Sequence, residues 1–183
     1  MGTQFDGFTE DHLSFIPKQH IFFTASAGPE GKVNLSPKGM DALRVFTPNR
    51  LAYVNATGSG NETAGHLLQN PRLTVMWCSY DKDPMILRAY GTARAVHPRD
   101  AAYADLAAQL PQVTGARQII DMQIGMVQSS CGYAVPYMDF TGERPILNRW
   151  ATAKGSEGVA KYWEDRNQTT LDGLPTGVLH DTD

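Results

Sequence analysis

Apolar and polar residues alternate in short runs along the first half of the chain, with turn-forming residues between the runs. Runs bounded by Gly, Pro, Asn and Asp are typical of antiparallel strands joined by tight turns. The first two flank Gly28-Pro29-Glu30-Gly31 and are predicted to form a hairpin. Short connections favour an antiparallel sheet that closes on itself. We expect strands at residues 21–27, 32–36, 43–46, 51–55, 72–79 and 85–96.

Helical patterns interrupt these strands in few places. A short helix at residues 62–69 is predicted to begin at Ser59-Gly60-Asn61-Glu62, which has capping-box spacing, and to stop at Asn70-Pro71. No linker or repeat divides residues 1–183, so we expect one domain that ends in a helical segment and a tail. The remaining expectations are a helix at 99–110, one or two strands at 119–134, a helical segment at 143–167 split by Gly155 and Gly158, and an extended tail at 169–183.

The charge balance narrows the function classes. Sixteen Lys and Arg stand against 19 Asp and Glu in 183 residues, a formal charge of −3 without a basic stripe. Nucleic-acid and anionic-membrane binders are therefore not expected. Two cysteines, Cys78 and Cys131, form no Cys-x-x-Cys pair, and no signal-like or membrane-spanning run is present. We expect a cytoplasmic protein.

A glycine-rich turn, Thr57-Gly58-Ser59-Gly60-Asn61-Glu62-Thr63, leaves one predicted strand and opens a helix. Free backbone N–H groups at a helix start can bind an anion such as phosphate, although such a turn more often simply caps the helix. Two cations add to the anion hypothesis. Lys38 ends a strand, and Arg88 lies inside an apolar strand, where a buried charge needs a partner. The alternative places Arg88 on the solvent face and Lys38 in a turn.

The order of several segments resembles the pyridoxamine 5′-phosphate oxidase-like family of FMN-binding split barrels. The resemblance rests on Asn34-Leu35-Ser36-Pro37-Lys38-Gly39, Leu51-Ala52-Tyr53-Val54-Asn55, Gly60-Asn61-Glu62-Thr63-Ala64-Gly65-His66-Leu67 and Asn70-Pro71-Arg72. It extends to Cys131-Gly132-Tyr133-Ala134-Val135-Pro136 and Leu171-Asp172-Gly173-Leu174-Pro175, which look like an uncharacterised subgroup. It implies a mainly β, six-stranded antiparallel split barrel with peripheral helices, and a homodimer that holds FMN between its subunits.

The same resemblance implies a set of cofactor-binding residues. The strand with Asn34, Ser36 and Lys38 would run along the flavin, with Lys38 at the ring or the phosphate. The remaining residues expected at the cofactor are Tyr53 and Val54 on the next strand, Asn61 and Thr63 at the phosphate, and Arg88.

Two departures from authentic pyridoxamine phosphate oxidases stand out. Glu62 and Thr63 occupy the place of an Arg-Lys pair, so phosphate would be held by hydroxyl, amide and backbone donors with one distant cation. The C-terminal Trp and Arg-x-His group that grips pyridoxal phosphate has no counterpart, which argues against vitamin B6 oxidation.

The resemblance therefore predicts a flavoprotein oxidoreductase that transfers a hydride at flavin N5 to or from an unknown small-molecule substrate. The alternatives are a protein that binds the deazaflavin F420 or haem, and a flavin-binding module without catalysis. No catalytic side chain stands out. The five histidines show no metal-ligand spacing, so no metal is expected.

Overall fold

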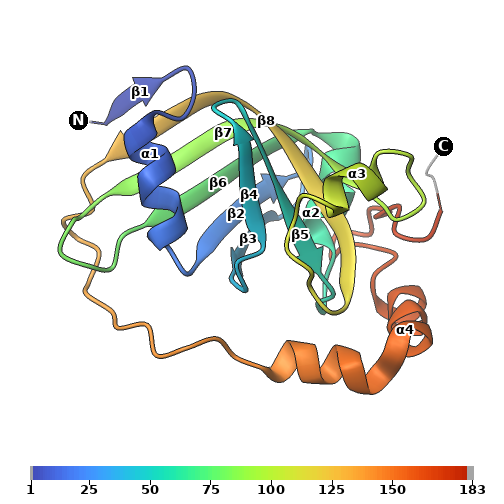
Figure 1. Ribbon diagram of the computed structural model, residues 1–183. Coiled ribbons are helices and arrows are strands. Elements are labelled where there is room, and N and C mark those ends of the chain that lie inside the picture. Colours follow the sequence, from blue (N-terminus) through green and yellow to red (C-terminus); the bar gives the residue numbers. More distant parts are fainter. Residues whose placement is uncertain (1, 181–183) are drawn as a thin grey trace.

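The computed structural model describes residues 2–180 as a curved antiparallel sheet with a few helices around it (Figure 1). Seven strands follow the order β3-β2-β6-β7-β8-β5-β4, and the short β1 pairs with β8. The mainly β antiparallel fold is confirmed, with eight strands in the sheet where six were expected. The strands are β1 Thr3–Phe5, β2 Phe22–Ala27, β3 Val33–Lys38, β4 Leu43–Thr47, β5 Arg50–Ala56, β6 Arg72–Cys78, β7 Ile86–Val96 and β8 Ala116–Ser130.

Strand β8 holds the sheet together because it pairs with β7 along one side and with β5 and β1 along the other. The segment expected at 119–134 is one continuous strand that begins three residues earlier and ends at Ser130. Its polar start, Arg117-Gln118, hid this extension from the hydrophobic pattern. The register places Gln118 opposite Asn55 of β5, which carries Arg117 to the end of the sheet where the pocket described below lies.

Two apolar clusters lie on opposite faces of this sheet. The larger one fills the inside of the curve and includes Tyr53, Trp77 and Met122. The smaller one lies outside, where Ile119 and Val54 pack against α3. Alternate residues of a strand face opposite sides, so neighbouring residues of β5 and β8 enter different clusters.

The helices are α1 Glu10–Phe15, the 3₁₀ turn η1 Ile16–Lys18, α2 Glu62–Gln69, α3 Tyr103–Ala107 and α4 Ile146–Arg166. The α2 prediction is confirmed, whereas the helix expected at 99–110 is shorter. Gly155 breaks α4 with a φ of 66°, as predicted, but Gly158 lies within the helix. The predicted capping box is wrong: Asn61 is the N-cap and makes no side-chain cap, because its amide pairs with Gln118. The Glu62 carboxylate accepts from the Leu171 N–H.

The prediction of an extended tail is also wrong for residues 169–180, while 181–183 lie outside the described residues. The segment turns back on itself: Thr169 bridges Pro175, and the Thr170 N–H donates to the Leu174 carbonyl at 2.9 Å. It packs on α2 so closely that a Cβ at Gly65 would collide with the Thr170 methyl group. Chemistry-bearing residues of the C-terminal segment therefore lie beside the start of α2.

Among residues 2–180, the helices are all too short or too polar to cross a bilayer.

Candidate functional site

A cavity of about 570 Å³ lies where the end of β3, the end of β5, the start of α2, the start of β8 and the C-terminal segment meet. Hydroxyl, amide and cationic side chains dominate its walls. Its lining residues are Asn34, Ser36, Pro37, Lys38, Asn55, Gly58, Ser59, Gly60, Asn61, Glu62, Thr63, Arg117, Arg166, Thr169, Thr170 and Leu171.

Two of the cations in this cavity are shielded from water, Arg117 fully and Lys38 in part. Arg117 is only 2% exposed. Burial lowers the pKa of Arg117 to about 10. Burial also lowers the pKa of Lys38, and the nearby positive charge of Arg117 adds to this effect, so that it lies at about 8. Arg117 therefore makes the charged form of Lys38 less favourable in the ligand-free protein.

The partners of these cations carry no negative charge. Arg117 donates to the Gly60 carbonyl at 3.1 Å and to Asn167 Oδ1 at 2.6 Å, and its buried Nε has no acceptor. Lys38 Nζ donates to Asn55 Oδ1 at 3.2 Å. Within residues 2–180, no carboxylate forms an ion pair with either side chain. Because a buried charge without a counter-charge is costly, this cavity is suited to an anion.

Neutral donors surround the same space. In the described part of the chain, the backbone N–H groups of Ser59, Gly60 and Thr63 donate to no protein acceptor. Such groups at the start of an eight-residue helix, with glycines before it, favour a bound anion. Asn34 and Ser36 add polar side chains from the adjacent strand β3.

The structure brings together five of the eight residues expected at a cofactor: Asn34, Ser36, Lys38, Asn61 and Thr63 all line the cavity. The Asn61 side chain is bound to Gln118 by two reciprocal amide hydrogen bonds, of 2.9 and 3.4 Å, so its amide group is already paired within the protein.

The other three expected residues do not line this cavity. Tyr53 is fully buried in the inner core, and burial raises its pKa strongly. Val54 packs in the outer cluster. Arg88 lies on β7 and reaches Ser130 Oγ at 3.4 Å. Their contact with a cofactor stays a prediction.

Glu62, which replaces the first member of the Arg-Lys pair, also lines the cavity, but its carboxylate is held by the C-terminal segment. Its carboxylate accepts the N–H of Leu171 at 3.1 and 3.2 Å and so fastens the C-terminal segment to α2. Positive charge comes instead from Arg117 and Arg166, which sequence reasoning missed. A signal for Arg117 existed: a cation next to the start of a long apolar run, like that of Arg88, needs a partner.

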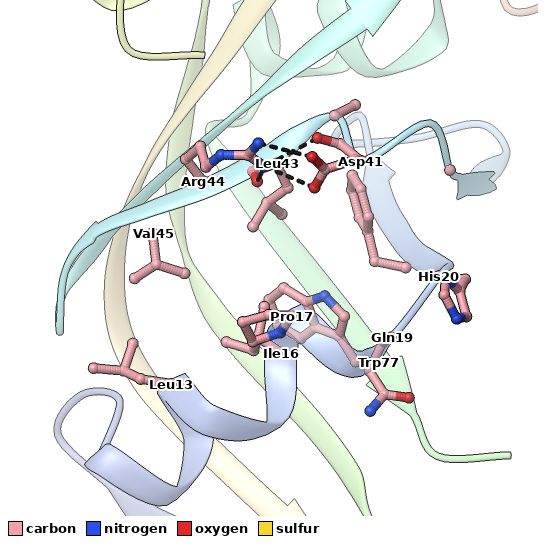
Figure 2. Close-up of a pocket in the computed structure, with 13 residues that line it drawn as sticks. Leu13, Ile16, Pro17, Gln19, His20, Asp41, Leu43, Arg44, Val45 and Trp77 are labelled. Carbon is pink, nitrogen blue, oxygen red and sulfur yellow. Dashed lines mark hydrogen bonds and ion pairs between the residues drawn. The ribbon is translucent and has the colours of Figure 1, made fainter. Parts of the chain in front are cut away.

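Two other cavities border the fold. Figure 2 shows one of about 440 Å³ under β4, where apolar side chains such as Ile16 and Trp77 predominate and Arg44 is held by Asp41. It offers no comparable buried cation. A larger groove of about 1080 Å³ shares Pro37 and Lys38 with the anion cavity and continues to apolar side chains that include Phe140 and Trp150.

Known proteins resemble this chain in sequence and in fold. The sequence profile for the family described as pyridoxamine 5′-phosphate oxidase matches residues 8–131. The pyridoxamine 5′-phosphate oxidase family protein ustO of Aspergillus flavus is 34% identical over 189 residues, which cover 93% of this chain and 76% of that protein.

Two crystal structures illustrate the similarity in fold. A putative pyridoxamine 5′-phosphate oxidase of Lactobacillus delbrueckii has a TM-score of 0.54 at 18% identity, over 67% of this chain and 94% of that one. A FAD-binding protein of Mesorhizobium loti has a TM-score of 0.50 at 11% identity, over 70% and 96%. At these identities the structures show a shared split-barrel fold.

Proposed function

The chain belongs to the pyridoxamine 5′-phosphate oxidase family, and from this premise we propose that it binds FMN and acts as an oxidoreductase on a small molecule. The observation that carries the proposal is the pair of the half-buried Lys38 and the buried Arg117, which lacks a carboxylate partner in the described part of the chain. A phosphate monoester carries up to two negative charges and would neutralise both cations at once.

The residues present fit such a group. Arg117 Nε and Lys38 Nζ supply charge-assisted donors, Thr63 a hydroxyl, and the turn before α2 its free N–H groups. The adjoining groove begins at Pro37 and Lys38 and offers apolar walls suited to a flat ring. The Mesorhizobium loti protein supports this choice by analogy, because a similar fold holds a flavin there.

The bound flavin would supply hydride transfer at N5. The role of this protein would be to bind and orient the flavin. The two cations and the turn before α2 would fix the phosphate end, while the groove would limit which small molecules reach the ring and shield it from water.

The first test is a titration of the purified protein with FMN and, as a matched ligand without the phosphate, riboflavin. We expect saturable quenching of FMN fluorescence and at least 10-fold weaker binding of riboflavin, since charge-assisted hydrogen bonds are lost. Equal affinities would remove the phosphate assignment, and absence of binding would remove FMN. Tighter binding of F420 or haem, seen by absorbance, would support those cofactors instead.

Oxidoreductase activity needs a separate test. The FMN-loaded protein is reduced anaerobically with nicotinamide donors and then mixed with electron acceptors, while the flavin absorbance is followed. We expect turnover with at least one donor and acceptor pair. Bound FMN that exchanges no electrons with any donor or acceptor would favour a module that only binds flavin.

We propose further that the functional unit is a homodimer. Strand β3, which forms a wall of the anion cavity, exposes Val33 and Leu35 by 73 and 65%. The arm at residues 131–145 exposes Tyr133, Tyr137 and Phe140, and Phe140 lines the neighbouring groove. Apolar side chains in such number favour burial by a second copy. Sedimentation should give twice the chain mass of 20.1 kDa, and Leu35→Glu should shift it toward monomer. A monomeric wild type would overturn this proposal.

A further inference from the structure

A chain of polar side chains lies inside the barrel directly behind the anion cavity. The alternation of β2 turns Thr24 and Ser26 inward. Thr63 and His66, three residues apart on α2, share one helix face and meet this strand. His66, Ser26 and Thr63 are 1, 4 and 5% exposed. Polar groups this deeply buried are hydrogen-bonded in a defined pattern.

The contacts connect these side chains in sequence. His66 Nδ1 lies 3.1 Å from Ser26 Oγ, and Ser26 Oγ donates to Thr63 Oγ1 at 3.5 Å. A second donor, Asn34 Nδ2, reaches the same Thr63 oxygen at 3.1 Å. The Asn34 amide is oriented by Ser36, whose hydroxyl donates to Asn34 Oδ1 at 3.0 Å. Thr63 is the member of the chain that lines the cavity.

The protons available on His66, Ser26 and Thr63 determine which group donates in each of these hydrogen bonds. The 3.1 Å contact between Ser26 Oγ and His66 Nδ1 needs a proton on one of these two atoms, and the second ring nitrogen decides which. That nitrogen, Nε2, is buried without a partner. A proton there would be an orphaned buried N–H, which proteins rarely contain. His66 is therefore the neutral tautomer protonated on Nδ1, which donates to Ser26 and leaves the Ser26 hydroxyl proton for Thr63.

The far end of the chain is the Thr63 hydroxyl. A hydroxyl oxygen accepts at most two hydrogen bonds, and Asn34 and Ser26 supply both. Thr63 can therefore meet a ligand only as a donor. This suits an oxyanion oxygen, which has lone pairs and no proton, and disfavours a ligand group that itself donates.

We infer that His66 is a positioning residue whose hydrogen bond through Ser26 fixes the Thr63 hydroxyl as a one-way donor into the cavity, and so selects a fully deprotonated phosphate monoester. The inference rests on the proposed anion site but concerns residues that do not contact the ligand themselves. Its effect is on the preference for a phosphorylated over an unphosphorylated ligand, which a purely structural role would not alter selectively.

The direct test is the protonation of the His66 ring, measured by long-range ¹H–¹⁵N NMR of the wild-type protein. We expect a protonated Nδ1 and a bare Nε2. The opposite tautomer would overturn the inference. This measurement needs no flavin, so it still decides the matter if FMN fails to bind and the proposed function falls.

The second test compares matched variants by their FMN and riboflavin dissociation constants. Ser26→Ala should reduce the FMN preference about 10-fold. Thr74→Val removes a hydroxyl from the neighbouring strand β6, outside these contacts, and should leave the preference unchanged. Equal effects of the two variants, or no effect of Ser26→Ala, would overturn the inference.

Substitutions of His66 complete the comparison. His66→Asn places an amide N–H near the former Nδ1 and should retain the preference within about 3-fold, whereas His66→Leu should lose it as Ser26→Ala does. Loss in both variants, with folded protein in each case, would contradict the role of the Nδ1 proton.

Discussion

Arg117 and Asp121 lie on the same face of strand β8, four residues or about 13 Å apart along the strand, and both sites involve arginine. Within the strand, Asp121 accepts from Arg50 at 2.9 Å and from Arg94 at 3.4 Å. Near the start of the strand, Arg117 contacts a carbonyl and an amide and lies near a second cation, the half-buried Lys38. The same strand thus supplies a carboxylate partner at Asp121 and none at Arg117. The lesson is that the missing counter-charge, more than the presence of arginine, identifies a ligand site.

The largest effect is expected from Arg117→Met, which removes the unbalanced cation. FMN affinity should fall about 100-fold, because the phosphate loses charge-assisted hydrogen bonds worth about 3 kcal/mol. Arg50→Met is the matched control, because Arg50 is paired with Asp121, and it should change the affinity less than 2-fold. Fluorescence titration measures both. Comparable losses in the two variants would contradict the distinction between a paired and an unpaired arginine.

The next effect concerns the pH dependence of stability. Lys38 has a pKa of about 8 when folded, below its ordinary value of 10.5. Between these values the unfolded chain binds more protons than the folded one, so ligand-free stability should rise with pH from 8 toward 10.5. The contribution of this one group is at most about 3 kcal/mol.

Urea unfolding between pH 7.5 and 10 checks this prediction. Lys38→Met should remove the rise, since the titrating group is then gone. In the wild type, bound FMN should also flatten the curve, because the phosphate raises the pKa of Lys38. Identical curves for wild type and Lys38→Met would show that the ammonium is not held in an unfavourable site.

The smallest effect is expected from Asp121→Asn, which removes the carboxylate that pairs with Arg50 and Arg94. Its partners Arg50 and Arg94 have side chains that are 37 and 65% exposed, so water replaces the lost carboxylate in part. Unfolding free energy should fall by about 1 kcal/mol, with FMN affinity unchanged. A clear loss of FMN affinity would mean that the Asp121 site influences the Arg117 site.

The sequence predicts those site residues whose positions follow from local patterns in the chain. Lys38 ends a strand, and Thr63 follows the glycine-rich turn, so turn and helix signals locate both residues. Arg117 could not be placed in the same way. Its position depends on the pairing of Gln118 with Asn55, a contact between residues far apart in sequence. Pairing register follows from packing of the whole sheet, which no local pattern encodes.

The fold shows a similar division. The hairpins and α2 follow from alternation and turn residues and appear where they were predicted. Helix α1 and strand β1 are only six and three residues long, too short for a periodic signal. The C-terminal segment lacks any pattern, and its place is decided by contacts such as those of Glu62 with the Leu171 N–H. Tertiary contacts of this kind override local preference.

The wall of the anion cavity that residues 166–171 contribute has a consequence for how the protein matures. These residues follow all the other lining residues in the order of synthesis. While residues 166–171 are still inside the ribosome, the cavity of the nascent chain lacks one of its walls. A ligand of this cavity would therefore meet its complete binding site only after residues 166–171 have been synthesised.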